Sequence, residues 1–272
     1  MTEQPGGPSL AMINHASAEP VSADCGAGRI EMRSQPGPNK HINEDCAAAF
    51  KVSDTQCVLA IADGVGGAPR GHDASRLALE ALNECLQDLE PNEPLRPRIT
   101  DAFELAHQRI MMLGIGAATT FIVAEINQQM LRTYHTGDSG SLVCGQRGKL
   151  KHKTLMHCPS AYLELAGEIT EQESLTHPQR HLVTNLLGID DMTIDISEPV
   201  KLAPLDTVLL ASDGVLDNAN TADLINLIRI GPLGKANQTL HLTMLQTMAG
   251  TVPPLPGKPD DLSFILYRSA KK

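Results

Sequence analysis

Aromatic residues are scarce in this sequence, which has no Trp, three Tyr and four Phe among 272 residues. The core must therefore be built from aliphatic side chains and Met, and little material is left for the aromatic surfaces on which nucleic-acid bases stack. Basic residues are also the minority, with 22 Lys and Arg against 32 Asp and Glu and a formal net charge of -10. Because nucleic acids and anionic membranes require basic patches, we expect neither as a partner.

Long apolar runs and paired cysteines are absent as well. No stretch approaches the run of about 18 apolar residues that spans a bilayer, and the first residues lack the basic-then-apolar order of a secretory signal. The six cysteines are scattered without a Cys-x-x-Cys pair, which favours reduced thiols in or near the core over a zinc site or a disulfide framework. We therefore expect a cytoplasmic protein with no membrane span.

The chain divides into a short tail and one large domain. Residues 1–22 mix Pro, Gly, Ser and small residues without a period, which predicts a flexible N-terminal tail. Residues 23–272 carry no linker and no internal repeat, so they are expected to form a single catalytic domain with a sizeable core.

Hydrophobic periodicity separates helices from strands. Apolar residues at steps of three and four predict helices over 72–89 and 99–113, the second starting at Thr100 or Asp101. Further helices are expected over 161–167, 221–230 and 237–250, and strands near 46–52, 57–62, 118–126, 130–137, 141–148, 207–214 and 262–268. Strands and helices come in blocks instead of alternating, which predicts antiparallel sheets with helices layered outside them.

Acidic residues recur where the predicted strands begin or end. The five sites are Asn43-Glu44-Asp45, Asp63-Gly64, Gly137-Asp138, Asp213-Gly214 and Asp260-Asp261. One Asp-Gly pair is commonly only a turn, but five such sites can converge on one edge of a sandwich. Gathered carboxylates repel one another and are normally held by cations, and oxygen ligands without suitably spaced Cys or His favour Mg²⁺ or Mn²⁺. The pattern therefore predicts a metal site that could bind phosphate.

In their order, the motifs NED, ADGVGG, TGDSGS, SDGVLDN and DDLSFIL resemble those of the metal-dependent serine/threonine protein phosphatases of type 2C, bacterial type. The likeness extends from Lys40 to Arg268. It implies an α+β fold, a four-layer αββα sandwich of two central antiparallel sheets flanked by helices. It also implies hydrolysis of phosphoserine and phosphothreonine by metal-activated water.

The resemblance implies a role for each matched residue. The ligands implied for two Mn²⁺ or Mg²⁺ ions are Asp63, the carbonyl of Gly64, Asp213 and Asp260, with Glu44 and Asp45 among them or just behind. Asp138 matches a carboxylate that helps to hold a third, weaker ion. Asp261 stands where the family usually has Asn and is the alternative to Asp260.

Substrate binding is expected beside the NED motif. Lys40 matches the family's phosphate-binding Arg, although an ammonium lacks the two-pronged geometry of a guanidinium. With Asp63 and Asp213 it is expected to be essential for catalysis. His41 could contact phosphate or donate a proton, or it could be a solvated loop residue.

Three functions fit these residues. The main one is a monomeric phosphatase of phosphorylated proteins that opposes a serine/threonine kinase. A pseudophosphatase would keep the fold and bind phosphoproteins without turnover, and a phosphatase of a small phosphate ester would share the same metal site. The presence of every matched acid favours an enzyme.

Overall fold

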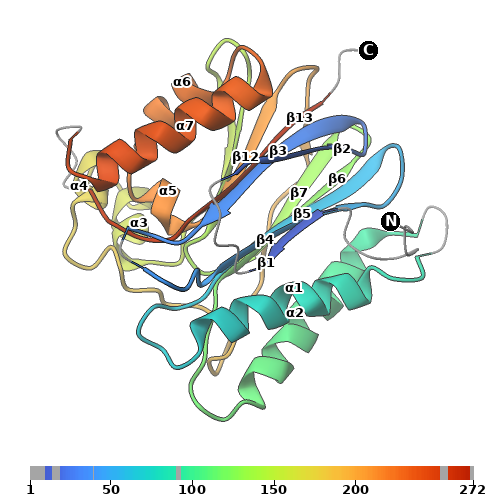
Figure 1. Ribbon diagram of the computed structural model, residues 1–272, viewed down its shortest axis with the longest axis vertical. Helices are drawn as coiled ribbons and strands as arrows, with labels where there is room; N and C mark the ends of the chain where they lie inside the picture. The colour runs from blue at the N-terminus through green and yellow to red at the C-terminus, as the bar shows by residue number, and fades with distance from the viewer. Residues whose placement is uncertain (1–9, 14–18, 39, 90–92, 252–256, 270–272) are drawn as a thin grey trace.

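The computed structural model describes residues 10–13, 19–38, 40–89, 93–251 and 257–269. Two antiparallel sheets lie face to face at the centre, and helices cover the outer side of each (Figure 1). The order of layers is thus helices, sheet, sheet, helices. The predicted α+β sandwich is confirmed.

The first sheet has seven strands in the described part of the chain, in the order β1-β4-β5-β6-β7-β10, and β11 also pairs with β7. The strands are β1 (Leu10–Ile13), β4 (Asp45–Lys51), β5 (Gln56–Asp63), β6 (Phe121–Asn127), β7 (Met130–Thr136), β10 (Asp195–Ile196) and β11 (Val200–Lys201). Antiparallel pairing of β4 with β5 sets Asp45 directly opposite Asp63. Two acids from adjacent motifs are therefore neighbours by register.

The second sheet has six strands over the same described ranges, in the order β2-β3-β13-β12-β8-β9. They are β2 (Val21–Cys25), β3 (Gly28–Gln35), β8 (Gly140–Cys144), β9 (Leu150–Lys153), β12 (Thr207–Ala211) and β13 (Leu262–Ser269). The last strand lies between β3 and β12, in the middle of the sheet. Asp213, just after β12, and Asp260, just before β13, consequently lie at the same end of this sheet.

Two pairs of helices cover the sheets, and shorter helices gather at one end (Figure 1). α1 (Gly71–Cys85) and α2 (Leu95–Met111) pack on the first sheet, whereas α6 (Thr221–Ile228) and α7 (Leu233–Met248) lie over the second. α3 (Pro159–Leu165), α4 (Glu171–Leu175) and α5 (Asp213–Leu216) lie at the end of the sandwich. No helix within the described ranges combines the length and the apolar character needed to cross a bilayer.

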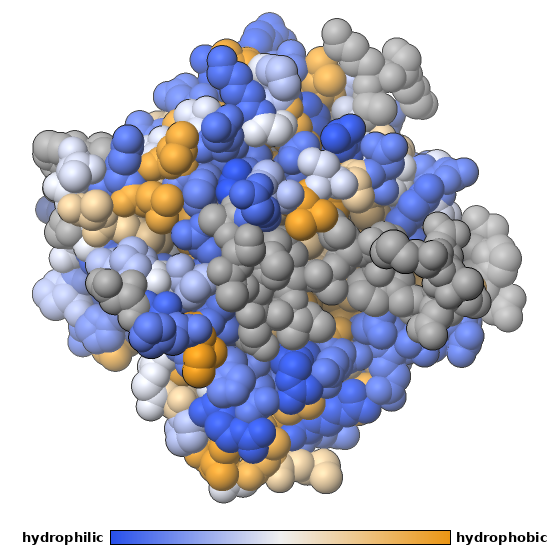
Figure 2. All heavy atoms as spheres, in the orientation of Figure 1, coloured by the Kyte–Doolittle hydropathy of each residue, from blue (hydrophilic) through white to orange (hydrophobic). Residues whose placement is uncertain are grey.

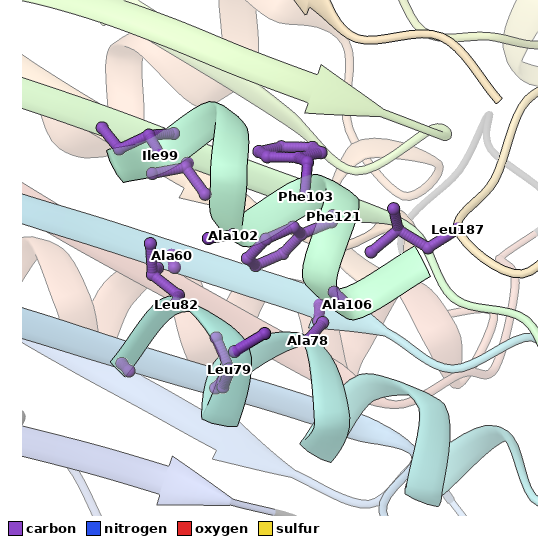
Figure 3. Close-up of a cluster of buried hydrophobic side chains, with 14 of the residues drawn as sticks. Ala60, Ala78, Leu79, Leu82, Ile99, Ala102, Phe103, Ala106, Phe121 and Leu187 are labelled. Atoms are coloured by element: carbon purple, nitrogen blue, oxygen red, sulfur yellow. The ribbon is translucent and has the colours of Figure 1, made fainter. Parts of the chain in front are cut away.

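The core consists of one cluster between the sheets and one under each helical layer. Alternate residues of β5 belong to two of these clusters, because Leu59 faces the other sheet while Ala60 faces α1 and α2. Figure 3 shows the helical side of this arrangement, where the rings of Phe103 and Phe121 have centroids 4.6 Å apart. On the face of the molecule that Figure 2 shows, hydrophilic side chains predominate and hydrophobic ones form separate small groups.

Two predicted boundaries need correction. The expected tail over residues 1–22 contains Leu10–Ile13, which pairs with β4, and Val21, where β2 begins. An edge strand is held by main-chain hydrogen bonds, which require no hydrophobic period in the sequence. The rest of the expected tail that precedes residue 19, residues 1–9 and 14–18, lies outside the described residues.

The second helix also begins earlier than predicted. α2 starts at Leu95 after the cap residue Pro94, and the Thr100 hydroxyl donates to helix carbonyls of Arg96 and Pro97 instead of capping the helix. Leu95 is buried against the core one turn before Ile99. The apolar face of α2 therefore begins before the polar residues that had suggested a later start of the helix.

The packing under α1 yields a stability prediction. Leu82 is buried between α1, α2 and the first sheet, so Leu82→Ala should lower the free energy of unfolding by about 2–5 kcal/mol. Leu165→Ala is the matched control, since that leucine is 71% exposed and its loss should cost less than about 0.5 kcal/mol. Urea unfolding of both variants measures the difference. Equal losses would contradict the assignment of the core.

Candidate active site

The acidic motifs of the sequence converge at one end of the sandwich. Asp63 ends β5, and the charges of Asp45, Asp138, Asp213 and Asp260 all act on its carboxyl group. Burial and this repulsion raise the pKa of Asp63 well above its ordinary value. The protein thus brings five carboxyl groups together from elements that are far apart in the chain.

Gly64 lies where two backbone segments pass close to each other. Its N–H donates to the Glu44 carbonyl at 3.1 Å, and an added Cβ would lie 3.0 Å from that oxygen and still nearer to the carbonyl of Gly71. No side chain fits between the end of β5 and the start of α1. The glycine after Asp63 is therefore required for close approach as well as for a turn.

Asp45 is fully buried at the start of β4. One carboxylate oxygen, Oδ2, accepts a hydrogen bond from the Ser212 hydroxyl at 2.8 Å, while Oδ1 has no partner among the described residues. Burial and the charge of Asp261 raise the pKa of Asp45 to about 8. A buried oxygen without a donor costs free energy unless another group, such as a cation, reaches it.

Asp260 and Asp261 have different surroundings. Asp261 is 2% exposed, and its two oxygens accept the backbone N–H groups of Gly37 at 2.7 Å and Glu44 at 2.8 Å. The side chain of Asp260 is 26% exposed, and Oδ1 accepts from Lys40 at 2.8 Å. Asp261 thus ties the NED segment to β13, which favours Asp260 as the residue facing the site.

Lys40 lies among acidic groups at the rim of this site. Its Nζ is 2.8 Å from Asp260, 3.2 Å from Asp261 and 3.6 Å from Glu44. Burial works to lower the pKa of Lys40, but Asp260 and Asp261 outweigh it and raise the pKa. The pKa of Glu44 is raised by its burial. His41, the next residue, is exposed on the same loop.

Asp138 follows a glycine turn that a histidine holds in place. Gly137 has φ of +99°, and its N–H donates to Nδ1 of His157 at 3.1 Å. The same nitrogen lies 3.0 Å from the amide nitrogen of Asn185. His157 therefore connects the turn before Asp138 to the loop that follows α4.

His135, His157 and Asp195 could in principle form a second metal site, because one ligand atom from each lies within 4.8 Å of the others. The hydrogen bonds argue against this. Since Nδ1 of His157 accepts from Gly137, the proton of the neutral ring is on Nε2, which faces Asp195 Oδ2 at 3.1 Å. A protonated nitrogen cannot bind a metal, so we assign this cluster a structural role.

Sequence reasoning missed the groups that surround the acids. Lys258 donates to Asp213 and lies 3.0 Å from Asp217, and Ser212 donates to Asp45. Asp217 lies within the quoted motif SDGVLDN and could have been included on that ground. A single lysine two residues before Asp260 gives no comparable signal.

Comparisons with known proteins agree on one family. The protein phosphatase 2C family model matches residues 38–230. The serine/threonine phosphatase stp of Listeria innocua is 24% identical over 208 residues, which cover 73% of this chain and 82% of that protein. Staphylococcus aureus Stp1 superposes with a TM-score of 0.77 at 24% identity, covering 90% of this chain and 97% of the other.

A further solved structure concerns metals. It is the catalytic domain of the serine/threonine protein phosphatase PstP in complex with two manganese ions. It superposes with a TM-score of 0.71 at 23% identity and covers 90% of this chain and 99% of that one. The fold of this protein is thus shared with a phosphatase that binds manganese.

The raised pKa of Asp45 predicts how stability depends on pH without metal. The folded protein holds a proton to about pH 8 that the unfolded chain releases near pH 4, so stability is lost as the pH rises through this range. With EDTA present, the free energy of unfolding should fall more steeply between about pH 6.5 and about pH 8 in wild type than in Asp45→Asn. Parallel curves from urea unfolding would contradict the assignment.

Proposed function

This chain belongs to the protein phosphatase 2C family, and we propose that it hydrolyses phosphoserine and phosphothreonine in proteins with the help of divalent metal ions. The observation that supports this best is the convergence of four other carboxyl groups on Asp63, together with a buried oxygen of Asp45 that has no partner among the described residues. Such a cluster is unfavourable by itself and becomes favourable when cations bind.

The donor set fits Mn²⁺ or Mg²⁺. We propose that Asp63, the Gly64 carbonyl, Asp213 and Asp260 hold two ions, with Asp45 and Glu44 close behind them. These are oxygen donors, which suit hard cations, and neither Cys nor His is among them. A third, weaker ion at Asp138 also follows from the resemblance.

Each side chain then has a defined task. When bound, the ions would supply positive charge that activates water and neutralises the phosphoryl oxygens. Asp63, at the end of β5, and Asp213, at the start of α5, would hold that charge, and Ser212 orients Asp45. We propose that Lys40 binds the phosphate group, because its ammonium lies beside Asp260 and its side chain is 34% exposed. His41, on the exposed side of the same loop, is proposed to contact substrate.

We further propose that the enzyme is a monomer that opposes a serine/threonine kinase. Its substrates are phosphoproteins, as expected for a member of this family. All six cysteines are free in the structure, which supports a reducing, cytoplasmic location.

Metal dependence tests the proposed function directly. After dialysis against EDTA, turnover of a phosphoserine or phosphothreonine peptide should disappear, and added Mn²⁺ should restore it, because the proposed site contains no protein nucleophile. Sugar phosphates and p-nitrophenyl phosphate should be poorer substrates than the peptides. A preference for a sugar phosphate would point to a small-molecule phosphatase, and binding of phosphopeptide without turnover would point to a pseudophosphatase.

Asp63→Asn tests the assignment of the site. The substitution keeps the size of the side chain but removes a charge that should hold metal, so turnover should fall by about two orders of magnitude or more while the fold survives. Asp54→Asn is the control, since that carboxylate is 95% exposed in the turn between β4 and β5. Circular dichroism and phosphopeptide kinetics measure both effects. Normal turnover in Asp63→Asn would remove this residue from the metal site.

A further inference from the structure

His157 holds both main-chain groups of a single glycine. Its ring nitrogen Nδ1 accepts the N–H of Gly137 at 3.1 Å, and its own N–H donates to the carbonyl of Gly137 at 3.0 Å. Gly137 has φ of +99°, and an added Cβ would lie 2.6 Å from the Thr120 side chain, so only glycine fits this turn. Since Asp138 is the next residue, these two hydrogen bonds fix the main chain from which its carboxyl group extends.

The neighbours of the His157 ring determine which nitrogen carries the proton. The amide nitrogen of Asn185 lies 3.0 Å from Nδ1. The orientation of that amide is fixed, because its oxygen accepts the N–H of Thr193 at 3.1 Å and its nitrogen donates to the carbonyl of Thr193 at 2.9 Å. Two N–H donors, from Gly137 and Asn185, therefore point at Nδ1, while Nε2 faces the carboxylate of Asp195 at 3.1 Å. Nδ1 is thus the acceptor and Nε2 the donor.

Further contacts keep the ring in this place. His157 is 4% exposed, and its ring stacks on that of His135 with centroids 4.6 Å apart and 20° between the planes. Nε2 of His135 lies 2.8 Å from the carbonyl oxygen of Leu155. The carbonyl of His157 accepts the N–H of Thr184 at 2.8 Å and the hydroxyl of Thr184 at 3.0 Å. His157 therefore joins the turn at Gly137, strand β7 and the loop that follows α4.

We propose that His157 is a positioning residue for the reaction: its acceptor at Nδ1 holds the turn at Gly137 and thereby sets the direction of the Asp138 carboxyl group. It acts through Gly137 and is not itself one of the proposed ligands. This inference rests on the proposed function, in which Asp138 belongs to the site. Lys40 is held by Asp260 and Asp261 and not by this turn, so loss of the acceptor should change kcat and leave KM unchanged.

Two substitutions separate the acceptor at Nδ1 from the rest of the ring. In His157→Asn the side-chain oxygen lies near the former position of Nδ1 and can still accept the N–H of Gly137, whereas the longer side chain of His157→Gln places its amide near the former Nε2. With Mn²⁺ and a phosphopeptide, His157→Gln should lose about 10- to 100-fold in kcat at an unchanged KM. His157→Asn should recover most of this loss. His107→Gln is the matched control and should turn over normally, since Nδ1 of His107 also accepts a glycine N–H, that of Gly188 at 3.3 Å.

Hydrogen exchange of the Gly137 amide measures the same contact in the metal-free protein, without turnover. Exchange should be slow in wild type and in His157→Asn and faster in His157→Gln. Rapid exchange in wild type would overturn the proposal, and this result does not depend on whether a variant folds.

The kinetic outcomes separate this inference from the proposed function. Normal kcat in a folded His157→Gln variant, or an equal loss of kcat in the Asn and Gln variants, would overturn the role of Nδ1 and leave the proposed function intact. A wild type without Mn²⁺-dependent turnover would overturn the proposed function and this inference with it.

Discussion

Repulsion between buried carboxylates is the constraint on which the active site depends. Asp45 and Asp63 face each other at the open end of paired strands, and neither can move away without breaking the ladder that holds them. The protein compensates for part of this repulsion with Lys40 and Lys258 and leaves the remainder to metal ions. Repulsion of this kind favours the binding of divalent cations, because every ion that enters lowers the electrostatic free energy of the carboxylates.

The rest of the fold gives these acids rigid supports. β5 is buried on both faces, so Asp63 continues a strand that packing fixes from two sides. Asp213 starts α5 directly after central strand β12, and Asp261 uses both carboxylate oxygens to fasten the NED segment to β13. Carboxyl groups carried on such elements keep their geometry better than groups on loops, which suits a reaction that requires accurate placement of phosphate.

Most of the architecture and the position of the acids could be predicted from the sequence. Short apolar runs such as CVLAIA marked the strands, and the Asp-Gly pairs marked where they end. Strand β3 was not predicted because GRIEMRSQ mixes charged with apolar residues, and its Arg33 and Glu31 become buried only through tertiary contacts. Lys258 was not predicted for a similar reason, since its role depends on Asp217 and Asn218, about 40 residues away in the chain.

The central position of β13 has a consequence for how the protein is made. Lys40 is 220 residues from Asp260, and β13, the strand that brings them together, leaves the ribosome after both of the strands between which it lies. At about 5–20 residues per second, the first acids wait on the order of ten seconds or more for their partners. The nascent chain therefore lacks part of the acidic cluster, and catalytic competence begins only when β13 inserts between β3 and β12.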